Sequence, residues 1–135
     1  MSRRLAREIA VRTLFQVDLA RANVDRAFAY SLEGFDLEEK DVRFARSLVD
    51  GVLRNLEAID RTISRAADNW SLDRMATTDR NILRIAVYEI CHAGEVPASV
   101  AVNEAVELAK TYGDADSGKF VNGILGFVLR GASPS

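Results

Sequence analysis

Basic and aromatic side chains share one face of the N-terminal segment. Arg3, Arg4 and Arg7 open the chain, and on a helix Arg4, Val11 and Phe15 fall within a strip about 40° wide. Guanidinium groups pair with phosphates and an exposed ring stacks on an unpaired base, so this pattern is typical of a surface for single-stranded RNA. The same spacing fits a core phenylalanine beside solvated arginines, and spacing alone favours that alternative.

A second candidate lies near the C-terminus, in the segment 114–123. Lys119, Phe120 and Asn122 would stand in the first turns of a helix, where they offer a cation, a ring and an amide near the positive end of the helix dipole. Helix capping and core packing explain the same residues, so both interpretations stay open.

No residues form a catalytic pattern. The sequence holds no phosphate-binding glycine loop, and its single cysteine and histidine, Cys91 and His92, are too few for a zinc shell. On a helix these neighbours point about 100° apart, which indicates a core thiol beside a surface imidazole. Glu104 and Glu107, one helical turn apart, are expected to be ordinary solvated carboxylates. We predict no catalytic residue, no metal and no cofactor.

The composition is that of one folded domain. The chain has 135 residues, of which 48% are hydrophobic and 28% charged. Its formal net charge of −2 argues against a uniformly basic nucleic-acid coat protein, but a local basic patch can bind RNA whatever the total. The single cysteine excludes an internal disulfide, and no stretch approaches 18 uncharged apolar residues. We therefore expect a cytoplasmic protein that does not cross a membrane.

Apolar residues recur at spacings of three and four along nearly the whole chain, which predicts an all-α fold of about seven helices. The expected helices cover residues 2–22, 23–32, 36–54, 55–67, 79–92, 100–112 and 117–130, with a short turn at 70–75. Asp36 and Ser99 are predicted caps, Asn55 is the predicted break, and the largely apolar run 79–92 is the predicted central helix. We expect two packed bundles in one compact domain over residues 1–135, divided at about 54/55.

At these residues the chain resembles the NusB family of transcription antitermination factors. The blocks that carry the resemblance are REIAVRTLF at 7–15, DRNILRIAVYE at 79–89, NEAVELAK at 103–110 and SGKFVNGIL at 117–125, with Val96-Pro97 between the second and third. Their order and spacing are specific, and together they cover essentially the whole chain.

The resemblance implies a non-catalytic, all-helical protein with two partners. It would bind the boxA element of nascent RNA together with NusE, the ribosomal small-subunit protein that doubles as a transcription factor. Through that complex it would modify elongating RNA polymerase, notably on ribosomal RNA operons. No cofactor is implied.

The resemblance also assigns roles to residues, by their match to the family's motifs. The RNA contacts it implies are Arg3, Arg4, Arg7, Phe15, Asp116, Lys119 and Phe120. The contacts with the protein partner that it implies are Asp79 and Arg80, with Leu72 and Met75 as apolar neighbours. The basic start is shorter than in many relatives, and Phe15 stands where a tyrosine is common, so we expect weak RNA binding without the partner.

Two alternative functions stay open. The nearest is an RNA-binding module of the kind that precedes the catalytic domain of some ribosomal RNA cytosine methyltransferases, because that module shares the expected fold. The other is a helical scaffold that binds only proteins, which would need neither the arginines nor the exposed rings. Some relatives self-associate, and a homodimer would cover the RNA face; the sequence does not choose between monomer and homodimer.

Overall fold

The computed structural model describes residues 2–68 and 70–132, and within them every regular element is a helix. The elements are α1 (Ser2–Ala20), α2 (Val24–Leu32), α3 (Glu39–Arg54), α4 (Leu56–Ala66), the 3-10 turn η1 (Leu72–Arg74), α5 (Thr77–Tyr88), the π-helical turn η2 (Glu89–Ala93), α6 (Ala98–Tyr112) and α7 (Ser117–Ala132). The predicted all-α fold of about seven helices is confirmed.

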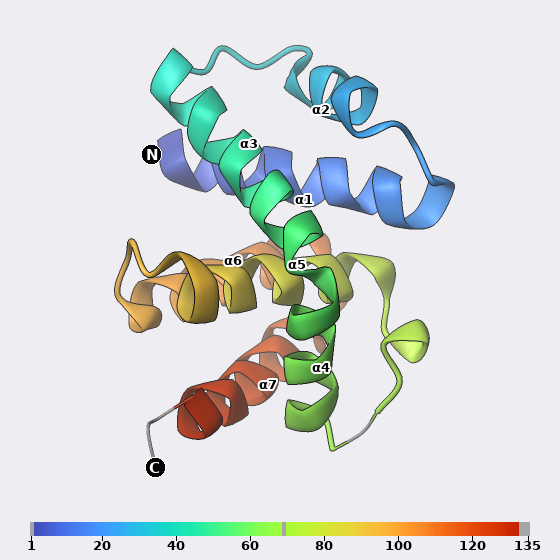
Figure 1. The fold of residues 1–135 in the computed structure, drawn as a ribbon, viewed down its shortest axis with the longest axis vertical. Helices are drawn as coiled ribbons and strands as arrows, with labels where there is room; N and C mark the ends of the chain where they lie inside the picture. Colours follow the sequence, from blue (N-terminus) through green and yellow to red (C-terminus); the bar gives the residue numbers. More distant parts are fainter. Residues whose placement is uncertain (1, 69, 133–135) are drawn as a thin grey trace.

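Helix α5 is the centre of the molecule, as its apolar circumference predicted. It packs against α1, α3, α4, α6 and α7, and Ile82, Leu83 and Val87 are at most 1% exposed. In Figure 1, α1, α2 and α3 lie together at the N-terminal end, α4 and α7 lie at the other end, and α5 and α6 run between them. One continuous apolar core joins residues from α1 to α7, so α1, α3, α4, α6 and α7 are all packed around α5.

The long helical stretch breaks at Asn55, as predicted. The Asn55 amide donates to the carbonyls of Gly51 and Val52, and its side-chain amide donates to the Gly51 carbonyl at 2.7 Å. These bonds satisfy the last carbonyls of α3, so that α4 can begin at Leu56 in a new direction. The grouping of the helices into two subdomains on either side of this break stays a prediction.

Neither Asp36 nor Ser99 acts as the predicted helix cap. Asn23 accepts a hydrogen bond from the Arg26 amide and begins α2. Asp36 does not cap α3, which begins three residues later after Glu38 with no side-chain cap. Ser99 lies inside α6, because Pro97 precedes the first helical residue and its carbonyl already accepts from Val100 and Ala101. Residue spacing alone does not predict whether a side chain or the backbone completes the first turn of a helix.

The predicted helix 79–92 changes type at Glu89. Its first part is α5, and Glu89–Ala93 form a π-helical turn that ends at Gly94, whose φ of +64° lies in the left-handed region that glycine adopts freely. None of the helices in the described part of the chain is long and apolar enough to span a membrane. The last helix runs to Ala132, two residues beyond its predicted end.

Candidate nucleic-acid interface

A groove of about 350 Å³ lies between α1, α2, the start of α5 and the end of α6. Its lining residues are Glu8, Val11, Arg12, Phe15, Gln16, Tyr30, Thr78 and Tyr112. The α1 members recur at spacings of three and four and therefore lie along one face of the helix. Arg4 stands one turn before Glu8, so the groove continues the basic face that the sequence predicted.

Three aromatic side chains line this groove. Phe15 is half-buried, whereas Tyr30 and Tyr112 are 63% and 45% exposed. Burial raises the pKa of Tyr112 and a hydrogen bond with the Glu8 carboxylate adds to the rise, so its phenol stays neutral at physiological pH. The rings offer stacking surfaces for unpaired bases, and none of them belongs wholly to the core.

The sequence pattern singled out Phe15 as a candidate, but it did not indicate that Tyr30 or Tyr112 would line the same groove. They come from α2 and from the last residue of α6, which the fold brings beside α1 from distant parts of the sequence. The one feature of the sequence that could have pointed to Tyr112 is its position directly before Gly113, which ends the helix. Arg12 also lines the groove, and its guanidinium carbon lies 5.4 Å from the centre of the Phe35 ring.

The N-terminal arginines occupy three different environments. Arg3 is exposed, with its guanidinium carbon 4.0 Å from the centre of the Phe44 ring. Arg4 is exposed but paired: its Nε and Nη2 donate to the two carboxylate oxygens of Glu104 at 3.0 and 2.6 Å. Glu104 is thus not the freely solvated carboxylate that its spacing predicted.

Arg7 is buried, with its side chain only 4% exposed. Its Nε and Nη2 donate to both oxygens of Glu89 at 2.9 and 2.7 Å, and Glu104 lies 3.8 Å from its Nη1. The predicted RNA contact of Arg7 would require breaking this buried pair, which is costly because Glu89 would keep an unpaired charge. The pairing was invisible in the sequence, where Arg7 and Glu89 are 82 residues apart.

The second predicted cluster lies at the start of α7. Asp116 and Lys119 are exposed, and Phe120 is half-buried against the core. The turn before them is ordered by Asp114, whose Oδ1 accepts from the Asp116 amide at 2.9 Å. The Ser117 side chain contributes to the pKa of Asp79, which follows the groove residue Thr78 in α5. The start of α7 therefore lies beside the first turn of α5, which supplies Thr78 to the groove.

The residues predicted to bind the protein partner are more deeply placed than expected. Arg80 is held by two bonds, from Nε to Asp18 Oδ2 and from Nη1 to the Leu72 carbonyl, each at 2.8 Å. Leu72 is half-buried, and Met75 is only 6% exposed. Of these residues, Leu72 and Arg80 keep part of their side chains accessible.

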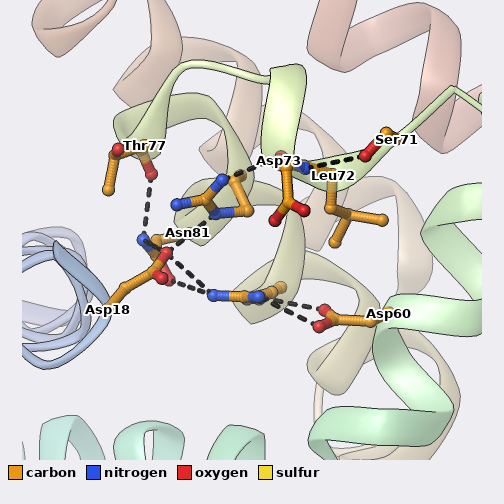
Figure 2. Close-up of polar contacts among 9 residues, drawn as sticks. Asp18, Asp60, Ser71, Leu72, Asp73, Thr77 and Asn81 are labelled. Atoms are coloured by element: carbon orange, nitrogen blue, oxygen red, sulfur yellow. Dashed lines mark hydrogen bonds and ion pairs between the residues drawn. The ribbon is translucent and has the colours of Figure 1, made fainter. Parts of the chain in front are cut away.

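Arg80 belongs to a polar network that joins four elements (Figure 2). Arg84 donates to both oxygens of Asp60, at 2.9 Å each, and to Asp18 at 3.0 Å, while Asn81 donates to Asp18 and to the Thr77 carbonyl. Burial alone would raise the pKa of Asp18, but bonds from Arg80 and Asn81 and the charges of both arginines lower it overall. The network fixes α1, α4 and η1 to α5.

Asp79 is a buried carboxyl group, 7% exposed. Its Oδ1 has no hydrogen-bond partner among the described residues. Burial raises the pKa of Asp79, the bond with Ser117 lowers it by less, and the charge of Asp114 adds to the rise. A direct contact between Asp79 and a partner stays a prediction.

The described residues contain no cluster of side chains suited to a metal ion. No group of three His, Cys, Asp or Glu side chains within residues 2–68 and 70–132 could hold a metal ion. Cys91 is exposed rather than a core thiol, so that prediction is wrong; it faces a separate groove between α4 and α7 that Phe127 also lines. The molecule is thus a small all-helical domain whose main chemical feature is an aromatic groove with a basic end.

Comparison with known proteins supports the classification as a small all-helical domain and shows which family it belongs to. A sequence model of the NusB family matches residues 4–130. The chain is 51% identical over 129 residues to the transcription antitermination protein NusB of Desulforudis audaxviator, covering 96% of this chain and 94% of the relative. It is 54% identical over 129 residues to that of Pelotomaculum thermopropionicum, covering 96% and 90%.

Solved structures agree. NusB from T. maritima superposes with a TM-score of 0.88 at 38% identity, covering 98% of this chain and 93% of that one. A crystal structure of the antitermination factors NusB and NusE in complex with dsRNA gives a TM-score of 0.88 at 30% identity, covering 96% and 97%. The chain belongs to the NusB family of transcription antitermination proteins.

Proposed function

We propose that this chain binds boxA-type single-stranded RNA along the α1 groove, together with NusE, and so helps to modify elongating RNA polymerase on ribosomal RNA operons. The observation that carries the proposal is the groove itself, in which Phe15, Tyr30 and Tyr112 offer stacking surfaces beside Arg12. The protein would work in the cytoplasm and without catalysis, as an adaptor between RNA and protein.

The two ends of the groove supply charge for the RNA backbone. Arg3 and Arg4 lie at the N-terminal end of α1, about 16 Å along the helix axis from Phe15 by the rise of 1.5 Å per residue. At the other end, Lys119 is exposed on the first turn of α7, where the helix dipole also favours an anion. Phosphates would be held at both ends and bases between them.

Some of the predicted residues would act indirectly. Arg7 positions the basic start of α1 through its buried pair with Glu89, rather than touching RNA. On the partner side, Leu72 offers a partly exposed apolar contact, and Arg80 holds the Leu72 backbone in place. Asp79 and Met75 would support this surface from beneath.

The test is a titration of labelled boxA-type RNA with the protein, alone and with NusE, followed by fluorescence anisotropy. We expect weak binding alone, tighter binding with NusE, and loss of both with a scrambled RNA of equal length. Arg4→Glu should weaken binding with no change in helical content. Binding that ignores both sequence and partner would overturn the proposal and favour a scaffold that recognises only proteins.

A further inference from the structure

Arg4 and Glu104 form the most exposed part of the charged cluster at the start of α1. Both donors on one edge of the Arg4 guanidinium are bound to Glu104, while the Arg4 side chain is 48% exposed and that of Glu104 is 18% exposed. Hydrogen bonding with Glu104, reinforced by its charge, raises the pKa of Arg4. The same bond lowers the pKa of Glu104, so both groups are charged at neutral pH.

We propose that Glu104 restrains RNA binding by occupying the guanidinium edge of Arg4 that a phosphate would otherwise receive. The inference rests on the proposed function and names a residue that limits its affinity. A carboxylate and a phosphate both use two parallel N–H donors of the same guanidinium edge, so Nε and Nη2 of Arg4 cannot serve both fully.

The Arg4–Glu104 pair is exposed enough for an incoming phosphate to break it. Ion pairs between partly exposed side chains contribute little to stability, because water competes for both partners. By contrast the Arg7–Glu89 pair is buried on both sides, at 4% exposure each, and stays closed. Of the two carboxylates that face the basic start, Glu104 is therefore the one that an incoming phosphate can displace.

Glu104 is not required to neutralise a buried cation. Its only other cationic neighbour among the described ion pairs is Arg7, at 3.8 Å, and Arg7 already has both oxygens of Glu89. Replacing Glu104 with glutamine keeps the shape of the side chain and leaves no buried charge unpaired. The substitution thus isolates the competition for Arg4.

The experiment compares E104Q with the matched control E107Q in the titration of boxA-type RNA with NusE present. Both variants remove one negative charge from α6, but Glu107 pairs with Lys110 at 3.4 Å and not with an N-terminal arginine. We expect E104Q to bind about 1.5- to 5-fold more tightly than E107Q, the value of an exposed ion pair. Its salt dependence should steepen by up to about 0.7 log units per log of salt, as one more phosphate contact requires.

Repeating both variants in an Arg4→Ala background tests whether the effect runs through Arg4. There the advantage of E104Q over E107Q should vanish. Equal affinities of E104Q and E107Q, weaker binding by E104Q, or an advantage that persists without Arg4 would each overturn the inference while leaving the proposed function intact. If the unmodified protein does not recognise boxA-type RNA even with NusE, the proposed function fails first and the inference fails with it.

Discussion

Phe15 is the side chain on which both the sequence pattern and the groove converge. It is half-buried and lines the groove together with Val11, Arg12 and Tyr112, so part of its side chain stays accessible. Stacking of one base on such a ring is worth about 1–3 kcal/mol.

Phe15→Ala should therefore weaken binding of boxA-type RNA by about 5- to 150-fold, measured by anisotropy with NusE present. Phe15→Tyr should keep the affinity, because it keeps the stacking face. Phe127→Ala, which removes an exposed ring on α7 away from the groove, is the control and should have no effect. Equal losses at Phe15 and Phe127 would show that neither ring is specific to RNA.

The raised pKa of Asp79 leads to a prediction about how the stability of the protein depends on pH. Because burial raises its pKa above the ordinary value of 3.8, the folded state holds its proton more tightly than the unfolded state does. Its ionised form therefore opposes folding at neutral pH, and this penalty is relieved as the pH falls through the raised folded value.

Asp79→Asn should accordingly unfold at a higher urea concentration than the unmodified protein at pH 7, and the difference should shrink as the pH falls towards 3.8. Asp73→Asn, at an exposed carboxylate of η1, should show neither effect. A difference that grows as the pH falls would contradict the assignment of a raised pKa.

The sequence indicated some of these site residues and missed others, for physical reasons. Phe15 was found because its position follows from helical spacing and the family's motif. The burial of Arg7 was missed because its partner Glu89 lies in a π-helical turn, and no local pattern indicates which carboxylate an arginine will meet. Tyr30 and Tyr112 were missed for the same reason, since their shared groove exists only after α1, α2 and α6 have packed.

Among the helices, the polar network around Asp18 fixes elements that lie far apart in the sequence. It ties the end of α1 to α4, η1 and α5 through Arg80, Asn81 and Arg84 (Figure 2). Its two arginines have side chains only 12% and 11% exposed, so losing the shared carboxylate would leave Arg80 without its charged partner and Arg84 with Asp60 alone.

Asp18→Asn should reduce the free energy of unfolding at pH 7 by about 2 kcal/mol, measured by urea denaturation. The pKa of Asp18 is lowered in the folded state, so its contribution is complete above the ordinary value of 3.8 and is lost as the pH falls through the lower folded value. The gap between the two proteins should close over that range.

The control for this change is Asp25→Asn. Asp25 pairs with Arg46 at 2.7 Å, but its side chain is 80% exposed, so its removal should cost less than about 1 kcal/mol. Equal costs at Asp18 and Asp25 would argue against a network that fixes the helices.

The helical class of the elements and the break at Asn55 were predictable because they depend on local spacing and local hydrogen bonds. The helix starts at α3 and α6 were not, because backbone bonds rather than the side chains of Asp36 and Ser99 complete them. The π-helical turn was also missed, since the apolar pattern continues through it unchanged.

For the whole molecule, charge placement matters more than the total of −2. Five acids and one lysine lie between residues 33 and 41, while Arg3, Arg4, Arg7 and Arg12 lie in α1. In the structure Glu89 and Glu104 pair with Arg7 and Arg4, which agrees with the weak RNA binding without a partner that the sequence predicts. The all-α class was predictable from periodicity alone, whereas this neutralisation depended on tertiary contacts.

The central claim is that RNA lies along the α1 groove. Photo-cross-linking of a boxA-type RNA carrying 4-thiouridine, with NusE present and mass-spectrometric mapping of the adducts, tests it most directly. We predict adducts on Phe15, Tyr30 or Tyr112, and at Lys119 or Phe120 for a thiouridine placed nearer the other end. Adducts confined to the groove between α4 and α7, at Cys91 or Phe127, would contradict the claim.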